Sequence, residues 1–313
     1  MATVLCVVGP TATGKTKMGV ALAKRFNGEV VSVDSMQIYR GMAVGTAAPT
    51  IEEMEGIPHH MVAVADPAES WSVARYVQAA DACVQDILSR GRLPVLVGGT
   101  GLYLDALIRG TDFAAGSQGT EIRQALQHRA RTEGIEALLE ELRKIDPTAA
   151  EKLHLRDEKR IIRALEVWQE TGRTITEHDA LERQRPPKYD ALYIGLGFED
   201  RQDLRDRIDR RVDAMVAQGL LAEVEALLSG GLPRNATALQ AIGYKQFLAV
   251  AEGTATTEEA IAEVKLRSRQ YAKRQLTWLR RNPDIFWVRW QRDPNFPEGL
   301  QKATEYLHSR GLC

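Results

Sequence analysis

The sequence predicts an α/β protein in which helices flank a parallel sheet and one all-α insertion interrupts the fold. Short apolar, β-rich segments lie at residues 3–8, 28–33 and 93–97, and each is followed by glycine or a polar residue. Amphipathic segments of helical period, at 17–26 and 70–90, separate them. From about residue 111 to 185 the strand signals stop. These three observations favour a parallel sheet with a helical insertion.

The first apolar segment continues into a phosphate-binding motif. Residues 9–16 fit the pattern G-x-x-x-x-G-K-[ST] without a mismatch. Glycines allow backbone N–H groups to surround phosphate oxygens, and the following helix adds its positive dipole end. Because a strand and a helix flank the motif, we favour a phosphate loop, and hence a phosphate-loop NTPase-like sheet, over a plain glycine-rich turn. The expected diphosphate-binding residues are Gly9, Pro10, Thr11, Ala12, Thr13, Gly14, Lys15 and Thr16, and the Thr16 hydroxyl can ligate Mg²⁺.

The composition is that of an ordinary globular protein. The chain has 313 residues, is 44% hydrophobic and has a formal net charge of −1, which argues against a uniformly basic nucleic-acid binder but leaves room for local basic faces. Three widely spaced cysteines are typical of a reduced cytosolic protein without disulfides or a zinc site. We expect a soluble cytoplasmic protein with no signal peptide, because no apolar run approaches the ~20 residues of a membrane span.

Polar residues follow the second and third apolar segments. Asp34 comes directly after residues 28–33, at the end of a strand where α/β sheets bind ligands, although an Asp before a Ser could also cap the next turn. Residues 93–97 are followed by Gly98-Gly-Thr-Gly101, where nucleotide-hydrolysing phosphate-loop proteins usually have a Mg²⁺-binding Asp. Glycine lets a bulky group approach the backbone, and Thr100 can hydrogen-bond to it. The missing carboxylate indicates that the loop does not serve ordinary ATP hydrolysis.

The insertion is expected over residues 116–185, within a core formed by residues 1–115 and 186–313. Hinges are expected near Gly116–Gly119 and at Pro186-Pro187. Helical segments are predicted at 121–132, 135–144, 147–153, 157–171 and 175–182. On the fourth of these, Lys159, Arg160 and Arg163 share one face, which could be a solvated, salt-bridged surface or an RNA contact.

Positive charge is also concentrated in the C-terminal part. Arg207 and Arg211 lie four residues apart on the amphipathic segment 201–218, and such a pair costs a few tenths of a kcal/mol unless an anion or distant Asp residues offset it. Residues 265–292 contain nine basic residues and one acid, a local balance of +8, with aromatic residues between them. That pattern is typical of RNA-binding surfaces. Trp278 and Trp287 could equally belong to the core.

Taken together, these segments resemble the bacterial tRNA dimethylallyltransferases, also called tRNA isopentenyltransferases. The matching stretches, in chain order, are 9–16, 34–41, 45–47, 94–103, 163–167, 241–244 and 271–278. They cover nearly the whole chain, so the resemblance is far more specific than the phosphate loop alone. The departure is slight: Thr13 stands where the family commonly has Ser.

The resemblance implies transfer of a dimethylallyl group from dimethylallyl diphosphate to N6 of the adenosine just 3′ of the anticodon. The phosphate loop would hold the diphosphate leaving group, stabilised by Lys15, by Mg²⁺ on Thr16 and by Arg211. Arg207 or Arg210 could replace Arg211, because the sequence does not fix which face of the helix is turned inward. Asp34 would accept the proton of the attacking amine, and Thr100 would hold the base.

The implied partners are dimethylallyl diphosphate and the anticodon stem-loop of a tRNA, with Mg²⁺ as the cofactor, and we expect a monomer. The stacked adenine must be turned out of the loop to reach the pocket. The residues implied to contact tRNA are Asp34, Ser35, Met36, Gln37, Thr100, Lys159, Arg160, Ile161, Ile162, Arg163, Gln240, Ala241, Ile242, Gly243, Tyr244 and Lys245.

Two other functions fit the phosphate loop less well. A kinase acting on a nucleoside or another small alcohol would need an acid after the third strand and a mobile arginine lid. A nucleotide-gated RNA-binding protein without transfer activity would have no need of a polar pocket formed by Asp34 and Thr100. An enzyme that expels diphosphate without splitting a phosphoanhydride accounts for the missing Asp better than either.

Overall fold

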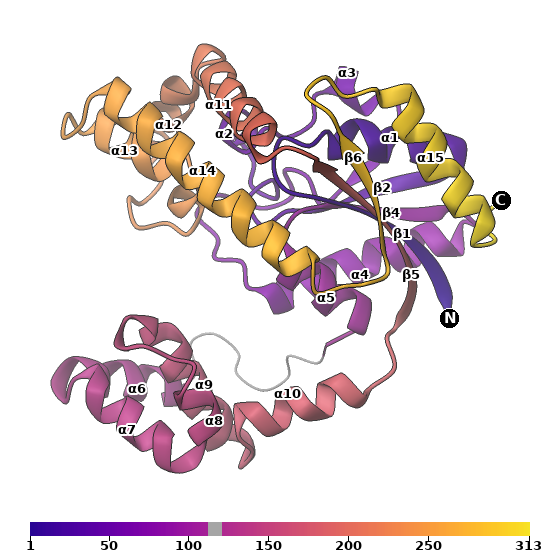
Figure 1. Cartoon of the computed structure of the whole chain (residues 1–313). Helices are drawn as coiled ribbons and strands as arrows, with labels where there is room; N and C mark the ends of the chain where they lie inside the picture. Colours follow the sequence, from indigo (N-terminus) through magenta and orange to yellow (C-terminus); the bar gives the residue numbers. More distant parts are fainter. Residues whose placement is uncertain (112–120) are drawn as a thin grey trace. The chain divides into compact units, whose positions relative to one another are not determined.

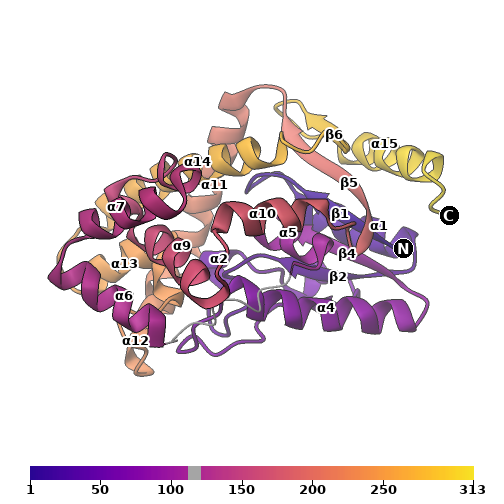
Figure 2. The ribbon, with the colours of Figure 1, turned by 90° about the horizontal axis from the view of Figure 1, so that it is seen from below.

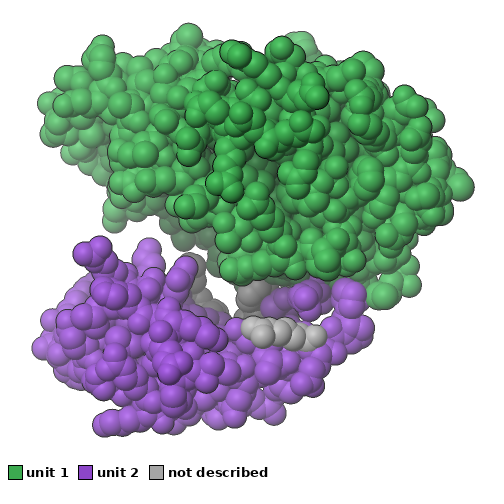
Figure 3. All heavy atoms as spheres, in the orientation of Figure 1, with its two compact units in different colours: residues 1–108, 188–313 green, residues 109–187 purple. Residues whose placement is uncertain are grey.

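The computed structural model describes residues 1–111 and 121–313, which divide into two compact units (Figure 1). Unit 1 comprises Met1–Ile108 and Lys188–Cys313, and unit 2 comprises Arg109–Pro187 (Figure 3). The sequence placed these borders at 115/116 and 185/186, a few residues inside the observed unit 2. The expected hinge near Gly116–Gly119 lies outside the described residues.

Unit 1 is built on the parallel sheet that the sequence predicts. Six strands follow in the order β3-β2-β4-β1-β5-β6, and all neighbours are parallel. β2 is buried along its whole length and β1 from its third residue onward, which explains their continuous apolar sequences. The strands are β1 (Ala2–Val8), β2 (Gly28–Val33), β3 (His59–His60), β4 (Leu93–Gly98), β5 (Tyr189–Phe198) and β6 (Ile285–Trp290).

The register brings the ends of three strands to one edge of the sheet. Val8, the last residue of β1, pairs with Gly98 at the end of β4, and Gly98 also pairs with Val33 at the end of β2. A Cβ on Gly98 would lie 2.0 Å from the Val33 carbonyl oxygen, so only glycine fits. The segments that follow these strands therefore leave the sheet side by side.

Helices cover both faces of the sheet. Alternate residues of the strands form one core with α1, α11 and α15, as expected for side chains on the same face. α4 runs along the other face against β2 and β4 (Figure 2), where buried Tyr76 donates a hydrogen bond to the Ser32 carbonyl at 2.7 Å. The longer helices of unit 1 are α1 (Lys15–Arg25), α4 (Val73–Ser89), α5 (Gly101–Arg109), α11 (Arg201–Ala217), α12 (Leu220–Ser229), α13 (Tyr244–Ala251), α14 (Thr257–Leu279) and α15 (Phe296–Ser309); α2 (Ala43–Thr46) and α3 (Ile51–Met54) are short.

The regular elements described in unit 2 are all helical. Each of the five helical segments expected from the sequence corresponds to a helix, although the third is only four residues long. Leucine and isoleucine side chains of α6, α7 and α9 form a core separate from that of unit 1. The helices are α6 (Glu121–Thr132), α7 (Ile135–Ile145), α8 (Pro147–Ala150), α9 (Glu158–Thr171) and α10 (Ile175–Gln184). Over residues 1–111 and 121–313, no helix has the length and apolar character needed to cross a membrane.

Candidate active site

The phosphate loop connects β1 to α1 through backbone conformations that few residues adopt. Gly14, just before α1, has φ +86, and a Cβ on Gly9 would lie 2.5 Å from the Leu196 carbonyl oxygen. Ala12 has φ +66, an unfavourable value for a residue with a side chain. Such strain is typical of a functional loop that its surroundings hold in place. Within the loop, the Thr13 hydroxyl donates to the Pro10 carbonyl at 2.9 Å.

Side chains from the C-terminal half of the chain hold this loop, and two of them bind its carbonyl groups. The indole Nε1 of Trp290, on β6, donates to the Thr13 carbonyl at 2.9 Å. Nε of Arg207, on α11, donates to the Ala12 carbonyl at 2.8 Å. The loop conformation therefore depends on residues almost 200 or more positions away in the sequence.

Lys15 is partly buried at the start of α1. Its Nζ donates to the Pro10 carbonyl at 2.8 Å. Burial and the nearby Arg211 lower the pKa of Lys15 to about 7, while Asp34 acts in the opposite direction. An anion placed beside Lys15 would favour its charged form and raise this pKa. The ammonium group is thus suited to pair with a phosphate oxygen.

The structure distinguishes the three arginines that the sequence left open. Arg207 is engaged with the loop backbone, and Arg210 is exposed. Arg211 lies one turn beyond Arg207, where burial lowers its pKa and Asp34 raises it. The charge of Arg211 also lowers the pKa of Lys15. Arg211 therefore interacts electrostatically with both Lys15 and Asp34.

Asp34 uses one carboxylate oxygen to shape its own turn. Oδ1 accepts from the backbone N–H of Met36 at 2.8 Å and of Gln37 at 3.3 Å. The turn-capping role weighed from the sequence is therefore present. Oδ2 makes no hydrogen bond to another described residue, so it is available to a ligand. Burial and then the Asp34 charge raise the pKa of Tyr271, which places Asp34 close to α14.

Thr100 presents a buried hydroxyl just after the end of β4. Its backbone N–H donates to the Val33 carbonyl at 3.4 Å, which fixes it beside Asp34. Its Oγ1 is buried and has no hydrogen-bond partner of normal geometry within the described residues. The Tyr271 hydroxyl is near enough for Thr100 to affect its pKa, but it falls short of that geometry. A buried hydroxyl without a partner costs about 1–3 kcal/mol, so a hydrogen bond from Thr100 to a bound group would be favourable.

Gln37 has its side chain occupied within the protein. The Ser32 hydroxyl donates to Gln37 Oε1 at 2.8 Å, and Nε2 donates to the carbonyls of Thr46 and Ala47 at 3.3 and 3.2 Å. Gln37 therefore anchors α2 and the residue after it to the sheet. Ser35 and Met36, its neighbours in the predicted tRNA-contacting set, are partly exposed.

The segment 240–245 was predicted to contact tRNA, but several of its side chains are buried. Tyr244 is fully buried, its hydroxyl donates to Glu223, and a Cβ on Gly45 would lie 2.5 Å from its ring. Glu223 also accepts from the N–H groups of Val44 and Gly45, at 2.9 and 3.0 Å. The Tyr244 side chain cannot contact RNA in this arrangement, nor can the buried side chain of Ala241. Gly243 is also buried, Ile242 is partly exposed, and Gln240 and Lys245 remain exposed.

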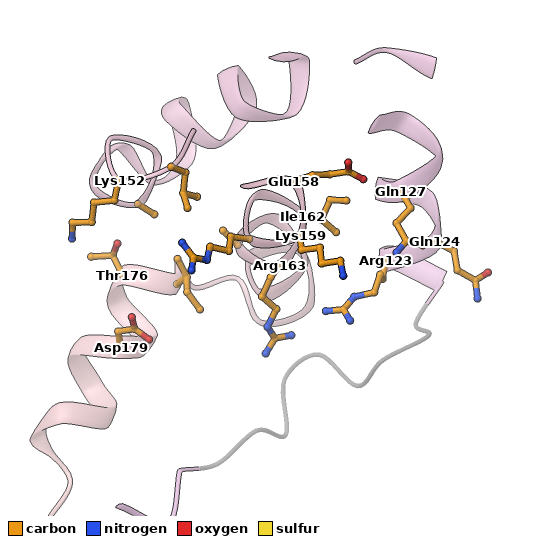
Figure 4. A pocket seen from close by; sticks show the side chains of 15 residues that line it. Arg123, Gln124, Gln127, Lys152, Glu158, Lys159, Ile162, Arg163, Thr176 and Asp179 are labelled. Atoms are coloured by element: carbon orange, nitrogen blue, oxygen red, sulfur yellow. The ribbon is translucent and has the colours of Figure 1, made fainter. Parts of the chain in front are cut away.

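A basic cavity of about 940 Å³ lies in unit 2, lined by side chains of α6, α9 and α10 (Figure 4). Lys159 and Arg160 are exposed at this cavity, and Arg163 pairs with fully buried Glu166 at 3.0 Å. Arg123 pairs with the same carboxylate at 2.5 Å, so two guanidinium groups are fixed in place. Ile161 and Ile162 are buried in the unit's core, although Ile162 also lines this cavity, and their contact with tRNA stays a prediction.

The basic C-terminal segment contains residues in ion pairs and residues that line a groove. Lys265, Arg267 and Arg269 form ion pairs with Asp213, Glu263 and Asp209. Lys273, Arg274 and Arg281 instead line an open groove of about 480 Å³ on α14, together with Trp278. Trp278 is partly exposed and donates to Asp105 at 3.1 Å, whereas Trp290 is buried. The groove thus offers cations beside an accessible aromatic ring.

Sequence reasoning gave no role to two further residues near the site, Gln275 on α14 and Glu223 on α12. Gln275 and Glu223 both bind backbone groups around the site. Gln275 carries a signal that could have indicated a role: it is a polar residue in the inward-facing stripe of α14, four residues from Tyr271 and Leu279. Glu223 has no comparable signal, because an acidic residue in the first turn of a helix is ordinary.

Two family models match the chain. One described as "IPP transferase" matches residues 37–282, and one described as "Isopentenyl transferase" matches residues 2–63. A tRNA dimethylallyltransferase of Caldanaerobacter subterraneus is 44% identical over 305 residues, with 97% of each chain covered. Another, from Halalkalibacterium halodurans, is 48% identical over 303 residues, covering 97% of this chain and 96% of the relative.

Solved structures of enzymes with the same kind of name are also similar to this chain. The full-length tRNA isopentenylpyrophosphate transferase from Bacillus halodurans is similar with a TM-score of 0.74 and 42% identity, covering 99% of this chain and 96% of that one. A eukaryotic dimethylallyltransferase acting on tRNA is similar with a TM-score of 0.83 and 28% identity, covering 99% of this chain and 80% of the other. The similarity therefore includes both units.

Proposed function

The chain belongs to the tRNA dimethylallyltransferase family and is a tRNA-modifying prenyltransferase, and we propose that its acceptor is N6 of the adenosine just 3′ of the anticodon. The observation that supports a transfer site here is the register at one sheet edge. It places the ends of β1, β2 and β4 together, and with them the phosphate loop, Asp34 and Thr100. A diphosphate and an acceptor base can therefore be held side by side.

The phosphate loop holds the diphosphate as a leaving group in this proposal. Backbone N–H groups of the loop and the N-terminal end of α1 surround its oxygens. Lys15 and Arg211 supply two positive charges that stabilise the negative charge developing as the allylic C1–O bond breaks. The lowered pKa values of Lys15 and Arg211 support these roles, because both cations are partly removed from water and an anion beside them would favour their charged forms.

Mg²⁺ is the proposed cofactor, and the donors at the loop suit it. The Thr16 hydroxyl makes no hydrogen bond to another residue of the described chain, so it can serve as a ligand. No group of three or more His, Cys, Asp or Glu residues gathers within residues 1–111 and 121–313. Mg²⁺ does not need one, since it commonly takes one or two protein ligands together with phosphate oxygens and water. When bound, it neutralises charge on the diphosphate.

Asp34 acts as the general base and Thr100 positions the adenine. The N6 lone pair attacks C1 of the dimethylallyl group, the C1–O bond breaks, and diphosphate leaves. The N6 proton passes to Asp34, whose Oδ2 makes no hydrogen bond within residues 1–111 and 121–313. The buried Thr100 hydroxyl supports a hydrogen bond to the base.

The RNA surfaces are assigned to exposed cations of each unit. In unit 2 they are Lys159 and Arg160, with Arg163 held beside them by Glu166. In unit 1 they are Lys273, Arg274 and Arg281 around Trp278. Side chains of this kind suit a phosphate backbone and unstacked bases. Gln240 and Lys245 are further candidates, and we propose a monomer acting in the cytoplasm.

The product of the reaction tests this function directly. Purified protein is incubated with Mg²⁺, dimethylallyl diphosphate and an unmodified tRNA, and the nucleosides are analysed by mass spectrometry. We expect dimethylallyl modification confined to the adenosine 3′ of the anticodon, with release of diphosphate and no turnover of ATP. Modification at another nucleotide would overturn the acceptor assignment, and turnover of ATP without prenyl transfer would overturn the function.

A further inference from the structure

The side chain of Gln275 joins the two sides of the candidate active site. Its Oε1 accepts from the backbone N–H of Thr11 in the phosphate loop at 2.9 Å. Its Nε2 donates to the carbonyl of Gly99, next to Thr100, at 3.0 Å. Gln275 is only 6% exposed, so water does not readily replace either bond. One amide thus connects backbone from β1–α1 to backbone from β4–α5.

The surroundings of Gln275 are shaped to allow this bridge. A Cβ on Gly99 would lie 2.1 Å from Gln275 Nε2, so glycine is required for the amide to reach the carbonyl. One turn earlier on α14, Tyr271 lies near both Thr100 and Gln275, and each of them affects its pKa. One turn later, Trp278 packs against Gly101. Tyr271, Gln275 and Trp278 on the inner face of α14 therefore lie along residues 99–101.

We propose that Gln275 is a positioning residue, which sets the separation between the diphosphate loop and the segment that holds the acceptor base. The inference rests on the proposed function, because in a prenyl transfer the leaving group lies on one side of this bridge and the nucleophile on the other. Gln275 itself contacts neither substrate.

This role has a kinetic signature. Displacement at C1 needs the attacking nitrogen and the leaving oxygen at opposite sides of one carbon, and a misplacement of 1 Å can slow such a step about 10²-fold. Without the two hydrogen bonds of Gln275, dimethylallyl diphosphate can still bind at the phosphate loop and the acceptor base can still bind beside Thr100. Removal of the bridge should therefore lower the rate of transfer much more than the affinity for either substrate alone.

The first test is Gln275→Met, which keeps the length of the side chain and removes both hydrogen bonds. We expect the single-turnover rate to fall about 10- to 100-fold, while dissociation constants for dimethylallyl diphosphate and for tRNA, each measured alone, change less than about threefold. Gln301→Met, the same change at an exposed site on α15, is the matched control. A single-turnover rate within about threefold of the wild-type rate would overturn the inference. A slower rate would also overturn it if the affinity for dimethylallyl diphosphate fell by the same factor.

A second variant keeps the inference testable if Gln275→Met does not fold. In Gln275→Glu, a neutral carboxyl group can accept from Thr11 N–H and donate to the Gly99 carbonyl, whereas the carboxylate can only accept. The rate of this variant, divided by the wild-type rate at each pH, should rise as the pH falls from 8 to 6. A ratio that stays constant would contradict the bridge. Wild-type protein that transfers no prenyl group would refute the proposed function instead.

Discussion

The indole Nε1 of Trp290 lies 2.9 Å from the carbonyl oxygen of Thr13, and this bond connects the last strand of the sheet to the phosphate loop. Trp290→Phe should leave that buried carbonyl without a donor and a small cavity beside it. We expect a loss of about 2–4 kcal/mol in the free energy of unfolding and a raised KM for dimethylallyl diphosphate. Trp287→Phe, on the same strand, is the control in chemical denaturation and kinetics. Equal KM values in both variants would contradict a role in holding the loop.

Asp34→Asn separates the two functions of this side chain. The amide oxygen can still accept from the N–H of Met36 and Gln37, so the turn is kept, but the general base is lost. The rate of transfer should fall roughly 10²–10⁴-fold with both substrates saturating. Affinity for tRNA should be largely unchanged in a filter-binding assay. A near-normal rate would show that Asp34 acts only in the turn.

The lowered pKa of Lys15 predicts a pH-dependent affinity for the diphosphate. In the free protein this pKa is about 7, and a bound diphosphate raises it, so the complex holds more protons than its components. Affinity should therefore fall as the pH rises from 7 to 9, by up to about tenfold per pH unit. Lys15→Arg, which stays charged, should flatten this dependence. Calorimetry with dimethylallyl diphosphate in the absence of tRNA measures both, and a wild-type affinity that is constant or rises with pH would contradict the prediction.

The exposed cations of α9 should contribute to tRNA affinity through charge. Replacing both Lys159 and Arg160 by Ala should weaken tRNA binding and reduce the slope of log K against log salt by about two, if each contacts one phosphate. Affinity for dimethylallyl diphosphate alone should stay the same. Lys302→Ala, an exposed lysine on α15, is the control. An unchanged slope in the double variant would argue against this face as an RNA surface.

Glu29 should contribute to stability rather than to catalysis. Its buried carboxylate accepts from Arg90, from Arg92 at 3.0 Å and from His60 at 2.8 Å, and the bonds to Arg90 contribute most to lowering its pKa to about 2. Because the folded-state pKa lies below the ordinary value of 4.5, the stabilisation is complete above pH 4.5 and is lost as the pH falls toward 2.

Glu29→Gln should accordingly lower the free energy of unfolding by about 2–4 kcal/mol at pH 7, because Arg90, Arg92 and His60 lose the carboxylate that they bind. The loss stays moderate because the side chains of Arg90 and Arg92 are partly exposed and remain hydrated. The difference from wild type should shrink as the pH is lowered below 4.5. Glu298→Gln, in an exposed pair with Lys302, should change little. Urea titrations across this pH range provide the measurement, and a difference independent of pH would contradict the assignment.

The sequence was sufficient for features that depend on neighbouring residues. The phosphate loop follows from glycine conformations and a flanking strand and helix, and β-rich runs identified β1, β2 and β4. Asp34 and Thr100 could be placed together because parallel strands end at one edge. α15 was not predicted, although Asn295 as a cap followed by Pro297 and Glu298 is a helix-start signal. α12 carries fewer signals, because its sequence LLAEVEALLS is apolar on several faces.

Only the tertiary structure decided the contacts between residues that lie far apart in the sequence. Trp290 lies 277 residues from Thr13 and Gln275 lies 264 from Thr11, and no local pattern relates the members of either pair. The different surroundings of Arg207, Arg210 and Arg211 depend on the rotation of α11 against the loop, which helical period alone leaves open. Tyr244 likewise looked like an RNA contact until its hydroxyl was found on Glu223. The sequence therefore determined which groups are candidates for the site, because they lie in local motifs, and packing determined which of them are engaged within the protein and which are left accessible.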